Sequence, residues 1–480
     1  MKQLENKVFY FLTVFLGIIF LINFIKISSL VSYFPLNDFM DGTSYMGRLA
    51  LLIKYGYHSF APNWYNGFYV LQHYAPGWFF FTLPLYWLTE SIEISTFISM
   101  FLSYLLSLIF FIMLGKEFRI SLIKSIAFFL LFYLSPSAFS SFFNLGRLPE
   151  LLAFTLFIPA FVLIYKNREL NKKFFFLFFL LFSILMLQQS SIVVFFSFLV
   201  LGLFFLISWK QRLILSILMI VALLLSLFWL IPFLNDEGTA LQYIRGITVA
   251  NFISFGTIIS ILFFISFLFF WNGRNRNRRD LIFFLPSLIL CFLYATRLVS
   301  FIPILDKIWP NSYNLFFTFL TIFFILATRF QNNVYKLVNF SLYLIPLLVL
   351  LIHFLYPVNG FDYGDTEYEI ISMFENVNDR VLIVSAGERL VSTRSLLAYA
   401  THYYNITTPD GWGEFSVQQK LYENVEDTKI VENKSCEEIT NNLIDLEIRQ
   451  IVALSDACRI LSDCQYDMVI KKENVCLLKL

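Results

Sequence analysis

Long apolar runs, each of about 18 residues or more, recur along the first 358 residues of the chain. A helix needs roughly 20 such residues to cross the hydrocarbon core of a bilayer. The chain is 58% hydrophobic and only 14% charged, whereas about a quarter of the residues in soluble domains are charged. The sequence therefore predicts a polytopic α-helical membrane protein.

Charge divides the chain into two parts. Through residue 359 there are 24 Lys and Arg against 12 Asp and Glu, whereas the remainder has 11 against 21. We therefore expect a transmembrane domain over residues 1–358 and an acidic soluble domain over residues 359–480. Nothing in the sequence resembles a nucleic-acid-binding module, and the basic loop Gly273–Asp280 is better explained as a topology signal.

Loops rich in Lys and Arg mark the cytoplasmic side of a membrane protein. They alternate with polar turns poor in these residues if about eleven helices cross the membrane. The N-terminus is then cytoplasmic and the C-terminal domain extracytoplasmic, and the first span is uncleaved because no small-residue cleavage site follows it. The expected spans lie near residues 8–30, 94–114, 122–141, 150–165, 174–188, 191–208, 213–234, 251–271, 280–295, 313–328 and 336–357.

The apolar segment Pro76–Leu88 is too short for a span. Its roughly 13 residues would reach about 20 Å as a helix, less than the hydrocarbon core of about 30 Å. Counting it as a crossing would also place every later basic loop outside. We expect an aromatic helix that lies flat in the outer interface, where Trp and Tyr prefer to sit, within a first external loop over residues 31–93.

Two carboxylates follow directly after the first span. Asp38 and Asp41 are three residues apart, so a helical turn would place both on one face. Such a pair can serve as a general base and a metal ligand, or it can simply cap and solvate a helix. Asp41 is the first candidate for a catalytic base. Asp38 would support it, or both would bind a divalent metal such as Mg²⁺ or Mn²⁺.

The segment Pro62–Pro76 adds aromatic residues to the same loop. Trp64 and Tyr74 could bind the faces of a sugar, or they could anchor the loop in the membrane interface. His73 could donate a hydrogen bond to a phosphate, and a structural histidine is the alternative. A zinc site is not expected, because the histidines have no Cys or His partner at metal-ligand spacing.

Further polar residues fall on the expected outer side. Arg147, in a short turn before a span, suits a lipid phosphate because a guanidinium is always charged and binds in a fork. Glu150 follows at the bilayer edge, where an ionisable group is a functional candidate, although Pro and Glu are also ordinary at a helix start. Arg245 and Arg297 are additional outer cations that could instead snorkel, and Gln188 lies in a polar turn that hydrogen bonds within the bundle would explain.

Three stretches in this order resemble the C-type glycosyltransferase superfamily. They are "DFMDGTSYMGR", "PNWYNGFY" with "HYAP", and "SPSAFSSFFNLGRLPELLAFTLFIPA". Members of that superfamily are polytopic enzymes that take a sugar from a polyprenyl-phosphate carrier outside the membrane. The chain is also similar, over roughly Met1–Val200, to prokaryotic membrane proteins labelled "6-pyruvoyl-tetrahydropterin synthase-related" and to the YfhO-like group. That label does not imply pterin chemistry.

The resemblance implies an inverting transfer from a polyprenyl-phosphate sugar donor to a lipid, glycan or protein acceptor at the plasma membrane of a prokaryote. Asp41 would remove the acceptor proton, and Arg147 and Arg297 would stabilise the phosphate. The chain departs from the pattern of related sequences in having Tyr45 and Gln188 near positions that often hold histidines. The Trp-Trp-Asp motif of oligosaccharyltransferases is replaced by "PDGWGEF", in which Trp412 could stack on a sugar. A non-catalytic lipid-glycan binding protein or a transporter of the same architecture is the alternative.

The soluble domain has a different periodicity. Arg380–Gly387 and Arg449–Asp456 are typical of short buried strands, and Cys436–Glu447 is typical of an amphipathic helix. We expect a small α/β or α+β domain. Its four cysteines permit one or two disulfides, whose pairing the sequence leaves open.

Overall fold

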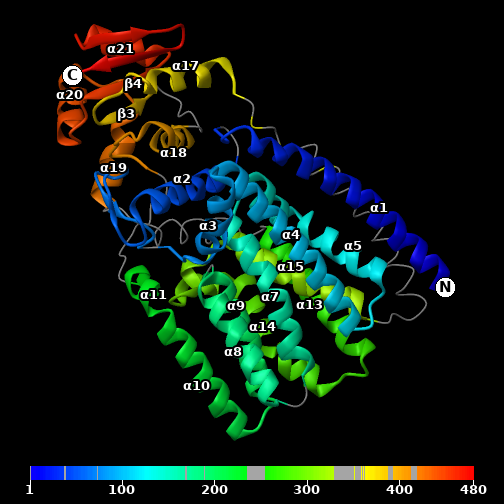
Figure 1. Cartoon of the computed structure of the whole chain (residues 1–480). Coiled ribbons are helices and arrows are strands. Elements are labelled where there is room, and N and C mark those ends of the chain that lie inside the picture. Colours follow the sequence, from blue (N-terminus) through cyan, green and yellow to red (C-terminus); the bar gives the residue numbers. More distant parts are fainter. Residues whose placement is uncertain are drawn as a thin grey trace.

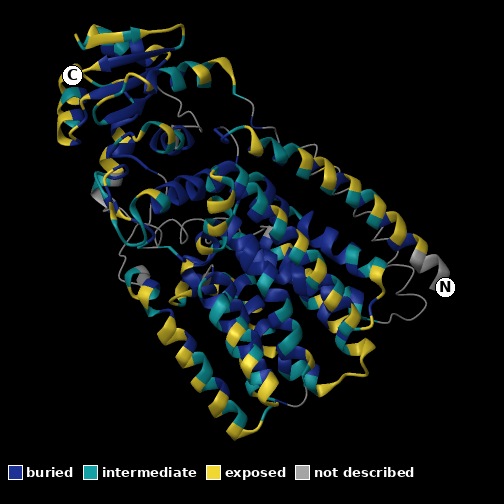
Figure 2. Ribbon diagram, viewed as in Figure 1, coloured by how far each residue is buried: buried dark blue, intermediate teal, exposed yellow. Residues whose placement is uncertain are grey.

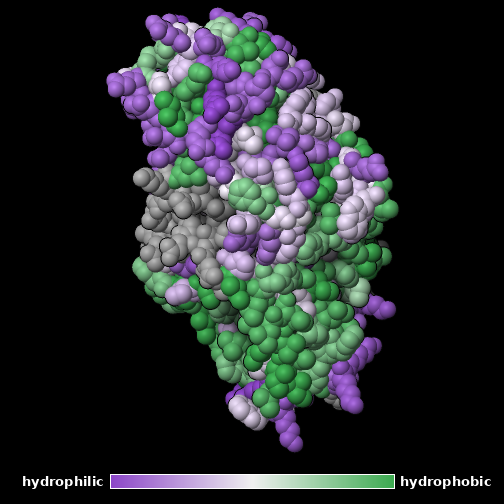
Figure 3. All heavy atoms as spheres, turned by 60° about the vertical axis from the view of Figure 1, so that its left-hand side comes forward, coloured by the Kyte–Doolittle hydropathy of each residue, from purple (hydrophilic) through white to green (hydrophobic). Residues whose placement is uncertain are grey.

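A long helical bundle with a small mixed α and β domain at one end makes up the molecule (Figure 1). A computed structural model describes residues 2–36, 39–72, 74–167, 170–188, 190–234, 255–328, 351, 358, 361, 363–386, 393–411 and 419–480. On the face seen in Figure 3, hydrophobic residues cover most of the bundle away from the small domain, and hydrophilic residues gather on the small domain and at the far tip of the bundle. This division follows the charge division of the sequence.

Each expected span within the described residues is mainly helical, with interruptions at residues 134–135 and 226. Among the residues that the structure describes, five helices are long and apolar enough to cross a membrane, or six if the bent pair that begins with α5 is one span. The count of about eleven spans stays a prediction, and most of the last expected span lies outside the described residues. The bundle helices are α1 (Lys2–Ile27), α4 (Ile92–Glu117), α5 (Leu122–Tyr133), α7 (Leu148–Lys166), α8 (Lys172–Met186), α9 (Ser190–Phe204), α10 (Trp209–Leu225), α11 (Leu227–Leu234), α13 (Phe255–Gly273), α14 (Arg278–Ala295) and α15 (Pro310–Ala327).

Aromatic side chains fill the centre of the bundle. The ring of Phe319 on α15 lies 5.4 Å from that of Phe128 and 5.5 Å from that of Phe161, joining α15 to α5 and α7. Outward-facing apolar residues are instead exposed, as Leu21 on α1, Leu224 on α10 and Leu268 on α13 illustrate. Figure 2 shows this contrast between buried interior and exposed periphery. An exposed apolar periphery around a packed interior is what contact with lipid requires.

The first loop contains two helices, α2 (Met40–Tyr55) and α3 (Gly77–Thr89), with a two-stranded pairing of β1 (Phe60–Ala61) and β2 (Phe68–Tyr69) between them. α3 coincides with the apolar segment that was expected to be a short helix, and it is not among the helices long enough to cross a membrane. Its flat orientation stays a prediction. Glu90, with a φ of 55°, ends α3, and the Ser91 side chain then caps α4 by accepting from the Ile94 amide.

A sharp bend follows α5. The next segment, α6 (Pro136–Ala138) and the π-helical η2 (Phe139–Asn144), meets α5 at 56°. Proline at the first helical position favours such a restart, because it has no amide to donate to the preceding turn. The bend delivers residues 144–147 to the start of α2.

The C-terminal domain has a four-stranded sheet in the order β3-β4-β6-β5. β3 is parallel to β4, and the other two pairs are antiparallel. Both predicted strands and the predicted helix are confirmed, as β3, β4 and α20. The elements are α17 (Asp365–Phe374), β3 (Val381–Val384), α18 (Thr393–Tyr404), α19 (Gln419–Thr428), α20 (Cys436–Asp445), β4 (Gln450–Leu454), α21 (Asp456–Asp463), β5 (Asp467–Lys471) and β6 (Val475–Lys479).

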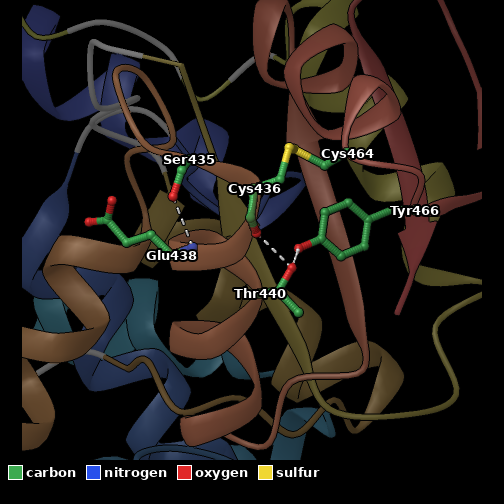
Figure 4. The surroundings of a disulfide bond; sticks show 6 residues. All are labelled: Ser435, Cys436, Glu438, Thr440, Cys464 and Tyr466. Atoms are coloured by element: carbon green, nitrogen blue, oxygen red, sulfur yellow. Dashed lines mark hydrogen bonds between the residues drawn. A yellow bond between two sulfur atoms is a disulfide. The ribbon is translucent and has the colours of Figure 1, made fainter.

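Two disulfides, whose pairing the sequence had left open, tie α20 to the end of α21 and α21 to the sheet. Cys436 at the start of α20 pairs with Cys464 after α21, and Cys458 on α21 pairs with Cys476 on β6. Figure 4 shows the first disulfide, next to a 2.7 Å hydrogen bond between the Thr440 and Tyr466 hydroxyls. Disulfides persist in oxidising compartments.

Candidate active site

The first turn of α2 is fastened to the loop before α7. The amides of Asp41 and Gly42 donate to the Leu145 carbonyl at 2.8 and 3.1 Å. The Phe39 ring covers Gly146, where an added Cβ would lie 2.7 Å from the ring. Gly146 also has a φ of +67°, so glycine is required there for two reasons. Asp41 is thereby placed beside Arg147.

An ion-pair cluster joins three helix starts at this point. Arg147 Nε donates to Asp41 Oδ2 at 3.0 Å, and Arg147 Nη1 lies 3.6 Å from Glu150 Oε2 in the first turn of α7. The Ser312 hydroxyl at the start of α15 donates to Glu150 Oε1. The Arg147 guanidinium also lies over the Trp309 ring, 5.3 Å from its centre. We call Asp41, Arg147 and Glu150, with Ser312 and Trp309, the outer cluster, after the side of the membrane on which the sequence predicts the three charged residues to lie.

The outer cluster has two carboxylates for one guanidinium. Burial alone would lower the pKa of Arg147, but the adjacent Glu150 and Asp41 carboxylates outweigh it and raise that pKa, so the guanidinium stays charged. The side chain of Glu150 is 2% exposed, that of Arg147 15% and that of Asp41 29%. The cluster is therefore accessible from the Asp41 side.

Tyr45 and Arg48 lie further along α2, and Tyr74, in the segment before α3, contacts both of them. The Tyr74 hydroxyl donates to the Tyr45 hydroxyl at 2.8 Å, and the Arg48 guanidinium lies 4.9 Å from the centre of the Tyr74 ring. Burial raises the pKa of Tyr74 to about 12 and raises that of Tyr45 further above its usual range. Both hydroxyls are therefore neutral at physiological pH and able to donate and accept hydrogen bonds.

Trp64 is placed away from the outer cluster. Its side chain is fully buried, and Nε1 donates to Thr401 Oγ1 on α18 at 2.9 Å. A Cβ added to Gly47 on α2 would lie 2.8 Å from the indole ring, so the ring fills the space between α2 and the C-terminal domain. In this position the indole packs two domains together.

The remaining candidates are distributed along the same end of the bundle or fall outside the described residues. Gln188 is buried, and its amide packs against Gly77 at the start of α3. Arg297 lies between α14 and α15 with a left-handed backbone, φ 66°. Four candidates are outside the described residues: Asp38, His73, Arg245 and Trp412.

The described residues do not assemble a metal centre. They contain no group of three His, Cys, Asp or Glu side chains placed to share an ion. The Asp41 carboxylate contacts a guanidinium, which is not a metal ligand, and its expected co-ligand Asp38 is not described. No step below is derived through Mg²⁺ or Mn²⁺.

Ser312 and Trp309 are cluster members that the sequence did not indicate. They belong to the segment "WPNS", where Pro310 occupies the first helical position of α15. A Trp-Pro pair before a span is an ordinary helix start. Only the packing of α15 against α7 brings Ser312 to a carboxylate 162 residues away.

Comparison with solved structures gives the fold. ArnT from Cupriavidus metallidurans matches with a TM-score of 0.54 at 12% identity, covering 97% of each chain. The Archaeoglobus fulgidus oligosaccharyltransferase matches with a TM-score of 0.52 at 12% identity, covering 93% of this chain and 69% of that one. The mycobacterial arabinofuranosyltransferase AftD matches with a TM-score of 0.53 at 12% identity, covering 98% of this chain and 40% of that one.

The chain has the C-type glycosyltransferase fold. This confirms the fold class expected from the sequence, an integral membrane protein with a C-terminal sheet domain. No family model matches the sequence, and no curated protein matches it. At 12% identity the likeness shows the C-type glycosyltransferase fold and leaves the reaction to be argued from the site.

Proposed function

We propose that this protein is an inverting membrane glycosyltransferase that moves a sugar from a polyprenyl-phosphate donor to an acceptor hydroxyl on the outer face of the membrane. The observation that carries the proposal is the contact between Asp41 and Arg147, a carboxylate and a guanidinium partly accessible at one end of the bundle. The fold supports the donor class, because ArnT has been solved bound to undecaprenyl phosphate and the archaeal oligosaccharyltransferase with dolichol phosphate.

The reaction is a single displacement at the anomeric carbon. The acceptor oxygen attacks opposite the phosphate, and the bond between the anomeric carbon and the phosphate oxygen breaks. Its electron pair stays on the polyprenyl phosphate, which leaves. Asp41 takes the acceptor proton and later returns it to solvent, and Arg147 stabilises the charge that develops on the leaving phosphate. Attack from the opposite face inverts the anomeric configuration.

Neighbouring groups complete the proposed site. The neutral hydroxyls of Tyr45 and Tyr74, which contact each other near Asp41, are proposed to bind sugar hydroxyls. Arg297 is a proposed second phosphate cation. Asp38, His73 and Arg245 stay proposed members on the sequence argument alone. Trp64 is left out because its indole is fully buried against α18.

The proposed orientation puts the outer cluster and the C-terminal domain outside the cell. Thr43 on α2 and Ser395 on α18 share a 3.1 Å hydrogen bond, so the site and that domain lie on the same side of the bundle. The two disulfides favour an extracytoplasmic location for the domain. The basic loop Gly273–Asp280 lies at the far tip of the bundle, where the positive-inside rule places the cytoplasm.

Cysteine labelling tests this orientation. Of the native cysteines, Cys291 is buried and the other four are paired, so the background is low. The variants are Glu90→Cys after α3, Asp365→Cys in the C-terminal domain and Arg276→Cys at the far tip, all at exposed positions. A membrane-impermeant maleimide should label the first two in intact cells and the third only after lysis. Labelling of Arg276→Cys but not Glu90→Cys would overturn the orientation.

Turnover tests the activity. The full chain in lipid vesicles is given a radiolabelled sugar on undecaprenyl phosphate together with acceptor candidates. A glycosyltransferase releases undecaprenyl phosphate and labels the acceptor with inverted configuration. Binding of the donor without release would favour the non-catalytic lipid-glycan binder, and transfer of intact donor between leaflets would favour the transporter.

A further inference from the structure

Two carboxyl groups already contact the guanidinium that a donor phosphate would need. This inference rests on the proposed function. Asp41 contacts Arg147 at Nε, and Glu150 lies near Nη1. A phosphate that binds Arg147 through the Nε edge therefore has to displace the carboxylate that contacts this edge.

The contacts show which carboxylate is held and which is free to leave. Glu150 is 2% exposed and also accepts from the Ser312 hydroxyl, so it belongs to the packed start of α15. Asp41 is 29% exposed, and Arg147 is the side chain that the structure bonds to it. Releasing Glu150 would leave a buried charge uncompensated, whereas water can solvate Asp41. Asp41 is the partner that can be exchanged at low cost.

Trp309 keeps Arg147 in place during such an exchange. Its ring lies under the guanidinium plane at 5.3 Å, and this contact does not depend on Asp41. Held by Trp309 and Glu150, the guanidinium can turn its Nε edge from the Asp41 carboxylate to a phosphate oxygen. Arginine binds either anion through the same planar fork.

We propose that the Asp41–Arg147 ion pair is a donor-sensing latch: the donor phosphate displaces Asp41 from Arg147 and so frees Asp41 to act as the base. In the empty protein Asp41 is engaged with Arg147. In the donor complex Arg147 binds the phosphate, and the Asp41 carboxylate turns to the acceptor hydroxyl. The base is thus available only when a leaving group is bound, which disfavours proton abstraction from an acceptor or from water in the empty site.

The latch predicts that the loss of the Asp41 carboxylate strengthens donor binding, whereas a residue that helps to bind the donor would weaken binding when lost. Because Asp41 competes with the phosphate for Arg147, Asp41→Asn should bind undecaprenyl phosphate about three- to fivefold more tightly than the wild type, the size expected for losing one partly exposed ion pair. Glu150→Gln leaves the Asp41 competitor in place, so it should not tighten binding. Arg147→Ala should weaken binding about tenfold or more.

The measurement is calorimetric titration of undecaprenyl phosphate into the purified full chain in lipid nanodiscs. Asp41→Ser is a second latch variant in case Asp41→Asn fails to give a monodisperse protein. Glu90→Gln removes an exposed acid after α3 and is the matched control, with affinity expected to equal that of the wild type.

Each remaining outcome is decisive. Unchanged or weaker binding by Asp41→Asn, with binding lost in Arg147→Ala, overturns the latch and leaves the proposed phosphate cation standing. Equal tightening by Asp41→Asn and Glu150→Gln overturns the latch in favour of a general charge effect. Binding by Arg147→Ala at the wild-type affinity, or no binding by the wild type, refutes the proposed donor site and the latch with it.

Discussion

The two ends of the bundle each have an arginine–carboxylate cluster, and the two clusters are built differently. At the far end, Arg274 Nε lies 2.7 Å from Asp280 Oδ2, and the Tyr165 hydroxyl donates to Asp280 Oδ1 at 2.8 Å. Asp280 is 3% exposed there, and Arg279 Nη2 donates to the Asn167 carbonyl at 3.3 Å. In the outer cluster, two carboxylates share one guanidinium and Asp41 is partly exposed.

The difference separates a structural ion pair from a reactive one. The Asp280 carboxylate is buried, with its own cation and a hydroxyl donor, so a substrate does not reach it, and its contacts join α13, α14 and the end of α7. A surplus carboxylate at an accessible edge can bind a proton, and its shared cation can bind another anion. Charge balance and exposure, more than the residue types, distinguish the two ends.

The largest expected effect is on transfer at the outer end. Asp41→Asn should lower turnover of a polyprenyl-phosphate sugar by about 100-fold or more, because the proposed general base is lost. Asp280→Asn is the matched change at the far end, and its turnover per folded molecule should stay within about twofold of the wild type, since it touches no substrate. Radiolabel transfer normalised to monodisperse protein measures both. Full activity of Asp41→Asn would contradict the proposed base.

The next largest effect is on the stability of the protein, and we expect it for a change in the far cluster rather than in the outer cluster. Asp280→Ala removes the acceptor of the buried Tyr165 hydroxyl and should destabilise the protein by about 1–3 kcal/mol, whereas water can solvate the Arg274 side chain, which is 37% exposed. Asp41→Asn, at the partly exposed site, should cost less than about 1 kcal/mol. Thermal unfolding in detergent, followed by tryptophan fluorescence, compares the two variants. Equal shifts in melting temperature for the two variants would contradict the view that the far cluster is structural and the outer cluster is not.

A smaller effect concerns the support that the C-terminal domain gives to the outer end. Thr401→Val removes the hydrogen-bond acceptor of the buried Trp64 Nε1 and should cost about 1–2 kcal/mol. The loss should appear as faster proteolysis between α17 and α18, because the change loosens that domain from α2. Thr440→Val, which breaks a bond within the domain, is the control and should leave cleavage at that junction unchanged.

The smallest effect is expected for an exposed pair at the far end. Lys166 and Glu117 form an ion pair in which the side chains are 48% and 39% exposed. Glu117→Gln should change stability by less than about 0.5 kcal/mol, because water and salt screen such pairs. A melting temperature indistinguishable from that of the wild type at two salt concentrations is the expected result. A large drop in melting temperature would show that the exposure of an ion pair does not predict how much it stabilises this protein.

Local patterns in the sequence determined the elements. The apolar runs predicted the bundle helices, the short aromatic segment predicted α3, and apolar stretches bounded by turns predicted β3 and β4. Asp41, Arg147 and Glu150 could be singled out as rare charged residues beside apolar runs, because a bilayer makes every such residue costly. These signals lie within a few turns of chain, so no knowledge of packing is needed to read them.

Contacts between distant segments were decided only by the tertiary structure. Asp41 and Arg147 are 106 residues apart, Trp64 and Thr401 are 337 apart, and Ser312 meets Glu150 across 162 residues. The sequence proposed a sugar-binding Trp64 and left the cysteine pairs open, whereas packing buried that indole and paired the cysteines. The physical reason is that a side chain's chemistry is local, while its partner, exposure and local charge balance depend on which helices pack together.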